Sequence, residues 1–163
     1  CIFIYYNKDF VYYYHRSFIY YMLSYLWRWI MDKKLVEVVA AVIENENNEI
    51  LCALRSPIMV LPNMWEFPGG KIEKGESEHE AIEREIKEEL KCSVKATEII
   101  GKNIHEYENI IVSLTALKCI LVEGEPIADE HSKLIYLKKE NLKSLVWAPA
   151  DIPLVDKVIN SNK

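Results

Sequence analysis

The 163-residue sequence is poor in the residues that mark zinc-binding, disulfide-rich and linker-rich proteins. It has five glycines, six prolines and four cysteines, and no internal repeat or low-complexity linker follows residue 31. The cysteines are Cys1, Cys52, Cys92 and Cys119. None stands at Cys-x-x-Cys spacing, which argues against a zinc site and a dense disulfide framework. Isolated cysteines with apolar neighbours are typical of buried thiols in a reducing compartment, so we expect a cytoplasmic protein.

A basic excess is also missing. Twenty Lys and Arg residues face 25 Asp and Glu residues, which gives a net charge of −5. Residues 1–30 alone carry +2, from Lys8, Arg16 and Arg28 against Asp9, so the remainder carries −7. An acidic body argues against binding a nucleic-acid polymer, which requires basic patches. If the partner is a small anion, a bound cation has to mediate the contact.

Residues 1–30 contain no glycine, alanine or proline, yet hold eight of the ten tyrosines. The longest uncharged run, 17–27, has eleven residues, fewer than the roughly 18 needed to span a membrane. No small-residue cleavage site follows it. Three interpretations stay open: translated upstream sequence before a natural start at Met31, a membrane-associated segment, or a packed amphipathic helix. We expect 1–30 to lie outside the functional domain, 31–163 to form that domain, and no membrane partner.

Apolar, β-branched and alternating segments predict more strands than helices. The expected strands are 35–44, 49–55, 93–102, 104–107, 110–122 and 133–137. Residues 56–66 and the glycine-punctuated segment 67–77 read as loops. A chain with many strands and one helix in its middle predicts an α+β fold with a mixed sheet.

Helix signals are strongest at Ser77, which forms a capping box with Glu80 and predicts a helix from Glu78 to about Leu90. A short helix is expected at 141–145. A terminal helix is expected after Asp151, which reads as its N-cap, with Pro153 in the first turn.

Helix 78–90 collects glutamates in an unusual way. At about 100° per residue, Glu85, Glu88 and Glu89 fall within an arc of about 100°, directly beside an apolar stripe. The stripe is Ile82, Ile86 and Leu90. Carboxylates on a partly buried surface repel by several kcal/mol per close pair at an effective dielectric constant of about 20, unless a proton or cation intervenes. Oxygen ligands of this kind suit Mg²⁺ or Mn²⁺, although a solvated glutamate-rich face is the ordinary alternative.

The segment GGKIEKGESEHEAIEREIKEEL resembles the signature of the Nudix hydrolases. That signature is a glycine, five residues, a glutamate, seven residues and the pattern Arg-Glu-U-x-Glu-Glu-x-Gly-U, with U aliphatic. The matching residues are Gly70, Glu76, Arg84, Glu85, Ile86, Glu88 and Glu89. The resemblance implies an α/β/α sandwich with a central mixed sheet and a loop–helix–loop motif that binds Mg²⁺, for which Mn²⁺ can substitute.

The same resemblance implies a set of site residues. The catalytic set is Glu76, Arg84, Glu85, Glu88, Glu89 and Glu130. Within it, Glu76 and Arg84 are expected to orient the loop, and Glu130 to act as a further metal ligand or general base. The metal ligands are Glu85, Glu88, Glu89, Glu130 and the carbonyl of Gly69.

The last two positions depart from the signature. Lys91 replaces the last glycine, and Cys92 follows where an aliphatic residue is usual. Glycine ends a helix easily in the left-handed conformation, whereas a residue with a Cβ pays about 1–2 kcal/mol there. Either Lys91 accepts that conformation or the helix ends differently.

Beyond the signature, the sequence looks like the MutT-like and CTP-pyrophosphohydrolase-like branch, which hydrolyses nucleoside triphosphates to a monophosphate and pyrophosphate. The expected substrate is 8-oxo-dGTP or an ordinary or modified (d)CTP. Substrate-binding residues are expected to be Arg55, Gly70, Lys71, Trp147 and Asp151. An aspartate at 151 can accept a hydrogen bond from the cytosine amine, although Asp151 also reads as an N-cap and Trp147 as core. ADP-ribose or nucleotide-sugar hydrolysis and a non-catalytic nucleotide-binding module are the alternatives.

Overall fold

The structure, a computed structural model, describes residues 20–23 and 33–161. The chain divides into two compact units, Cys1–Lys34 and Leu35–Lys163. In the first unit, residues 20–23 form a helical turn. The rest of residues 1–30, for which three interpretations were left open, lies outside the described residues. Among the described helices, none has the length and apolar character that crossing a membrane requires.

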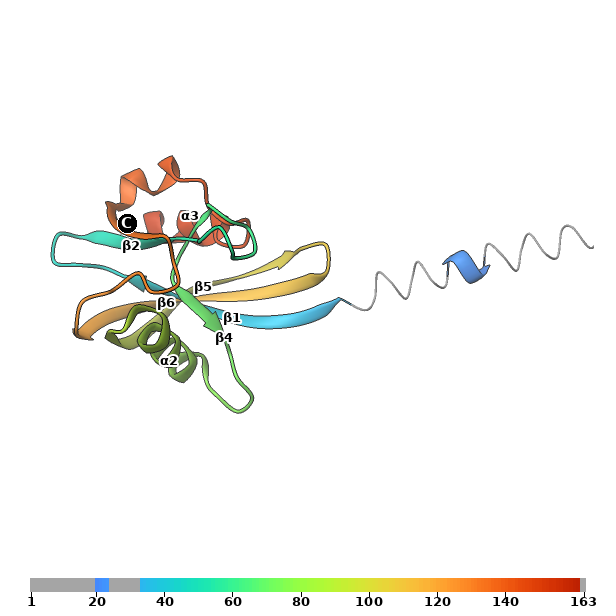
Figure 1. The fold of residues 1–163 in the computed structure, drawn as a ribbon, viewed down its shortest axis with the longest axis horizontal. Coiled ribbons are helices and arrows are strands. Elements are labelled where there is room, and N and C mark those ends of the chain that lie inside the picture. Colours follow the sequence, from blue (N-terminus) through green and yellow to red (C-terminus); the bar gives the residue numbers. More distant parts are fainter. Residues whose placement is uncertain (1–19, 24–32, 162–163) are drawn as a thin grey trace, which may run out of the picture. The chain divides into compact units, whose positions relative to one another are not determined.

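Seven strands of the second unit form two sheets (Figure 1). The first has the order β4-β1-β6-β5 and the second β3-β2-β7. The strands are β1 (Lys34–Ile43), β2 (Glu49–Leu54), β3 (Trp65–Glu66), β4 (Gly69–Lys71), β5 (Ser93–Glu106), β6 (Ile110–Glu123) and β7 (Lys133–Lys138). The helices are α2 (Glu78–Leu90), the 3₁₀ helix η1 (Lys139–Ser144) and α3 (Ile152–Asn160). The α+β class predicted from the sequence is confirmed.

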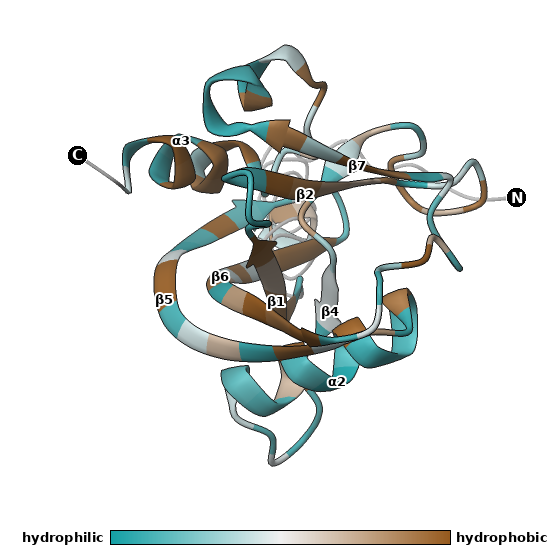
Figure 2. Ribbon diagram, turned by 90° about the vertical axis from the view of Figure 1, so that its left-hand side faces the viewer, coloured by the Kyte–Doolittle hydropathy of each residue, from teal (hydrophilic) through white to brown (hydrophobic). Residues whose placement is uncertain are grey.

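The second half of strand β1, residues 39–43, is buried on both faces because a different helix covers each. Its residues Val39, Ala41 and Ile43 pack in the core that contains the apolar stripe of α2. The alternate residues Ala40 and Val42 belong to a second core built with α3. Figure 2 shows the two helices on opposite sides of the strands. This alternation produces the expected α/β/α arrangement.

Two expected boundaries were wrong. Residues 93–102 and 104–107, predicted as separate strands, form the single strand β5, which pairs with β6 along its length. Its irregularity is taken up by register shifts between Ala96 and Ile99 and between Ile99 and Gly101, which bend the strand without ending it. The loops expected at 56–66 and 67–77 contain the short strands β3 and β4, because the neighbouring strands β2 and β1 supply hydrogen-bonding partners.

Helix α2 begins and ends as its sequence predicts. Ser77 accepts from the Glu80 backbone N–H, and the Glu80 side chain accepts from the Ser77 N–H. The apolar stripe Ile82, Ile86 and Leu90 is fully buried. Lys91 adopts the left-handed conformation at φ 56° and ψ 23°, so the first of the two alternatives for the helix exit is confirmed.

Candidate active site

Strand β4 brings main chain directly against the glutamates of α2. Gly69 pairs with Ala40, and Gly70 with Val39, on β1. A Cβ on Gly69 would lie 2.1 Å from the Val39 carbonyl oxygen. A Cβ on Gly70 would lie 2.2 Å from Oε2 of Glu85. Only glycine leaves room for the carboxylate there, so these two residues form a cradle of bare backbone beside Glu85.

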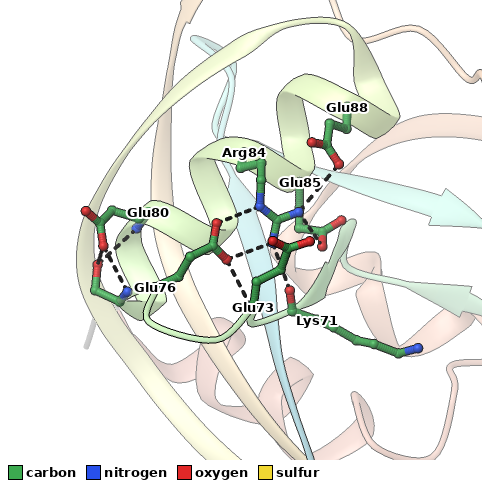
Figure 3. A network of polar contacts seen from close by, with 8 residues as sticks. Lys71, Glu73, Glu76, Glu80, Arg84, Glu85 and Glu88 are labelled. Atoms are coloured by element: carbon green, nitrogen blue, oxygen red, sulfur yellow. Dashed lines mark hydrogen bonds and ion pairs between the residues drawn. The ribbon is translucent and has the colours of Figure 1, made fainter.

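Arg84 gathers the loop and two of the three glutamates (Figure 3). Its Nε and Nη2 donate to the two carboxylate oxygens of Glu76 at 2.7 and 2.8 Å, a bidentate pair. Nη1 donates to Glu85 at 2.9 Å and lies 3.4 Å from Glu88, and Nη2 also donates to the Lys71 carbonyl at 3.0 Å. Together with the Glu73 N–H, Arg84 lowers the pKa of Glu76 to about 2. Arg84 thus ties the loop after β4 to the helix.

Glu89 has a different environment from the other two glutamates. Its Oε2 is buried and has no hydrogen-bond partner within the described part of the chain. Burial raises the pKa of Glu89 to about 7; nearby His131 lowers it, and the carboxylates of Glu66, Glu85 and Glu130 raise it further. A buried oxygen without a partner and surrounded by acidic groups is a position that a cation stabilises.

The helical arc suggested that the three glutamates share one partly buried environment, but they do not. The side chain of Glu88 is 63% exposed, and that of Glu85 is 14% exposed. The expectation that Glu88 lies on a partly buried surface was wrong, because its side chain is mostly exposed to solvent. Across residues 20–23 and 33–161, no three Asp, Glu, His or Cys side chains are grouped closely enough to form a metal cluster.

The residues present nevertheless fit a divalent cation. The unpartnered Glu89 oxygen supplies a hard ligand, and the acidic neighbours of Glu89 supply negative charge. The glycine cradle of β4 allows backbone to approach Glu85. Glu130, the expected further ligand, is exposed in the loop between β6 and β7, where its charge acts on Glu89.

Two functional candidates, Glu66 and His131, were given no role by the sequence analysis. One carboxylate oxygen of Glu66 accepts from Arg55, and the other lies 2.9 Å from the Nε2 atom of His131. The His131 side chain is 1% exposed, and its Nδ1 atom has no partner among the described residues. Burial alone would lower the His131 pKa, but the hydrogen bond to Glu66 leaves it raised. Arg55, the expected substrate-binding residue, therefore belongs to an Arg55–Glu66–His131 chain.

Asp151 stands at the N-cap position of α3 but does not cap it with its side chain, so that expectation was wrong. Its Oδ1 accepts from the Phe67 N–H at 3.1 Å instead, which links α3 to the segment before β4. Burial raises the pKa of Asp151 to about 8 against the lowering effect of that hydrogen bond. Asp151 is thus a buried acid joined to the site's main chain. Pro153 does lie in the first turn of the helix, as predicted.

The other expected substrate-binding side chains are placed apart. Trp147 is buried in the core with α3, where its ring centroid lies 4.8 Å from that of Phe67 and its Nε1 donates to the Leu142 carbonyl. Lys71 is exposed at the end of β4, and its ammonium group points away from Arg84 (Figure 3). Lys71 is therefore accessible to an anion, whereas Trp147 serves packing.

Comparison with known proteins identifies the family to which this fold belongs. The NUDIX domain family matches residues 34–158. The CTP pyrophosphohydrolase of Escherichia coli K12 is 37% identical over 123 residues, which cover 76% of this chain and 90% of that protein. The 8-oxo-dGTP diphosphatase of the same organism is 30% identical over 125 residues, which cover 77% and 97%.

Solved structures give the same result. The solution NMR structure of the DNA mismatch repair protein MutT, a Nudix hydrolase from methicillin-resistant Staphylococcus aureus 252, has a TM-score of 0.66 and 47% identity. The alignment covers 80% of this chain and 99% of that one. The chain belongs to the NUDIX domain family. It is a hydrolase that acts on phosphorus-containing acid anhydrides.

Proposed function

We propose that this protein is a Mg²⁺-dependent nucleoside triphosphate pyrophosphohydrolase that sanitises the nucleotide pool. It takes 8-oxo-dGTP or an ordinary or modified (d)CTP and releases the monophosphate and pyrophosphate. The observation that carries the proposal is the buried, unpartnered Glu89 oxygen, on the helix whose Glu85 lies against the glycine cradle, within a signature that keeps all of its glutamates. The names of the two Escherichia coli relatives support the class of substrate. The buried free thiols of Cys52, Cys92 and Cys119 support a cytoplasmic location.

Glu89, Glu85 and Glu88, with the Gly69 carbonyl and Glu130, would hold the cation. When bound, Mg²⁺ neutralises phosphate charge and activates water. Arg84 and Glu76 keep the loop after β4 fixed while substrate binds. Lys71 provides an ammonium group for the phosphates. Glu130 takes a proton as a water molecule attacks the β-phosphorus, and the bond to the bridging oxygen of the departing monophosphate breaks.

The first experiment is to measure pyrophosphate release by the full chain with ordinary, oxidised and methylated (d)NTPs and ADP-ribose. Glu88→Gln should lower turnover by about 10²-fold or more without loss of fold, because Glu88 is exposed and its 3.4 Å contact with Arg84 adds little to folding stability. Glu46→Gln, on the exposed turn between β1 and β2, is the matched control. Near-parental activity of Glu88→Gln would contradict the metal assignment. Activity on ADP-ribose alone would indicate another Nudix branch, and metal binding without hydrolysis would indicate a binding module.

Gly70→Ala should damage the site through the position of Glu85. The added Cβ would stand 2.2 Å from the Glu85 carboxylate, which therefore has to move away from the β4 backbone. We expect kcat to fall about tenfold or more, with a raised Mg²⁺ requirement. Gly75→Ala, in the loop after β4, is the control, because its Cβ would meet nothing within 4 Å. Its φ of +95° makes some loss of stability expected there. Equal activity of Gly70→Ala and the parent would show that Glu85 does not depend on the cradle.

A further inference from the structure

Lys91 ends α2 in a conformation that favours glycine, and its side chain is engaged on both sides of the helix end. Its ammonium group donates to the Glu88 carbonyl at 2.7 Å and lies 2.9 Å from the Asp129 carboxylate. A Cβ disfavours this left-handed backbone, so Lys91 adopts it against a local preference. A glycine at this position would make neither of the two side-chain contacts.

Asp129 lies in the segment between β6 and β7, residues 124–132, called here the acidic loop. Two contacts join this loop to the end of α2: the Lys91–Asp129 ion pair, and the Ile127 N–H that donates to the Leu90 carbonyl at 2.9 Å. The far end of the loop is joined to β2 by Ser132. The loop is therefore fastened at both ends.

These contacts flank the site. Lys91 follows Glu89, the last signature glutamate, by two residues, and Asp129 directly precedes Glu130. The charge of Glu130 acts on the buried Glu89, and that of Lys91 is in electrostatic contact with both Glu130 and Glu88. The ion pair thus connects the two segments that have to face each other for Glu130 to act with the glutamates of α2.

We propose that Lys91 is a positioning residue that holds the acidic loop, through Asp129, so that Glu130 faces Glu89. The effect of this positioning on catalysis rests on the proposed function, whereas the Lys91–Asp129 contact is independent of it. The two charged side chains are 51% and 54% exposed. An ion pair so exposed adds little to folding stability, so its effect belongs to the placement of the loop.

A helix end alone would explain only part of this geometry. A lysine in the last turn commonly binds carbonyls and offsets the helix dipole, as the contact with Glu88 does. That role needs no acidic partner in another segment. Asp129 therefore separates the two explanations, because removing it leaves the helix end intact.

The test compares Lys91→Gly, Asp129→Asn, the double variant and Lys91→Arg, all in the full chain. Glu125→Gln removes one charge from the same loop without touching Lys91, so it controls for simple loss of negative charge. Hydrogen exchange of the amides at 125–131 in EDTA measures how firmly the acidic loop is held in the absence of metal. Calorimetric titration with Mn²⁺ measures the cation site without turnover, and kcat with the Mg²⁺ concentration for half-maximal rate measures the reaction.

Lys91→Gly should unfold at an equal or higher temperature than the parent, because the backbone strain is relieved. It should nevertheless exchange faster at 125–131 and bind Mn²⁺ about threefold to fivefold more weakly. Asp129→Asn should do the same, the double variant should add nothing further, and Lys91→Arg should restore most of the parental behaviour.

Parental exchange and Mn²⁺ affinity in Lys91→Gly would overturn the proposal, and so would faster exchange with unchanged affinity. An effect of Glu125→Gln equal to that of Asp129→Asn would also overturn it, since loop charge alone would then explain the result. Failure of the proposed function is a separate outcome, seen as a parent that binds Mn²⁺ but hydrolyses no triphosphate.

Discussion

Glu89→Gln is expected to remove most of the hydrolytic activity while making the metal-free protein more stable above neutral pH. Glu89 is the glutamate of α2 whose carboxylate oxygen is buried without a partner. Loss of that ligand should lower kcat by about 10²-fold or more, because the charge that the cation requires is gone. Without metal, the same buried charge has only acidic neighbours and His131 around it. An uncharged amide of equal size removes that repulsion.

The sign of the stability effect follows from the two pKa values of Glu89. Burial raises its pKa from 4.5 to about 7 in the folded protein. Between these values the folded protein binds the proton and the unfolded chain does not, so stability falls as pH rises through this window. Above pH 7 the full penalty is present. Glu89→Gln has no such penalty and should be more stable than the parent there by about 1–3 kcal/mol.

Denaturant unfolding in EDTA at about pH 5 and pH 8, with parallel measurement of kcat, tests this expectation. The gain in stability should appear at the higher pH and be small at the lower one. Glu46→Gln serves again as the control for a glutamate on an exposed turn. Destabilisation of Glu89→Gln by equal amounts at both pH values would mean that the carboxylate makes a structural bond. Retained kcat would remove Glu89 from the site.

The parts of the fold that the sequence predicted well are those set by neighbouring residues. The capping box at Ser77 and Glu80 fixed the start of α2, and the apolar stripe fixed the face that is buried. Both depend on spacing within a few residues, so they are readable without a structure. Strands β3 and β4 were missed for the opposite reason. Segments of two and three residues become strands only because β2 and β1 lie beside them.

The site divides in the same way. The helical arc placed the three glutamates on one side of α2, but burial of Glu89 and exposure of Glu88 depend on which remote segments cover the helix. The Glu66–His131 contact joins residues 65 positions apart, and neither residue has a local pattern that indicates it. Lys91 was indicated by its sequence, because it replaces the signature glycine at the end of α2, where the backbone adopts the left-handed conformation.

Asp151→Asn is expected to change how the preference between cytosine and uracil depends on pH. Burial raises the pKa of Asp151 to about 8, and its Oδ1 accepts from Phe67. Below that pH the carboxyl group carries a proton and offers a donor; above it, it offers only acceptors. CTP carries an amine where UTP carries a carbonyl oxygen. If Asp151 reads this position, the ratio of kcat/KM for CTP over UTP should rise as pH increases through about 8.

Asparagine mimics the protonated acid, because it keeps a carbonyl oxygen for the Phe67 N–H and presents an N–H donor. The ratio of kcat/KM for CTP over UTP should therefore be independent of pH in Asp151→Asn. At about pH 8.5 it should lie about 10–100-fold below the parental ratio, the range for one base-edge hydrogen bond. The folded-state pKa is raised from 3.8 to about 8, so parental stability should fall as pH rises between these values and level off above about pH 8. The variant should escape that fall. A variant that gains this stability but keeps the parental ratio at every pH would show that Asp151 is a buried structural acid. If Asp151→Asn loses the pH dependence of both the CTP/UTP ratio and the stability, a single titrating group, Asp151, contacts the base and also affects folding. The hydrogen bond from the Phe67 N–H allows this double role, because Phe67 lies two residues before Gly69 of the cradle.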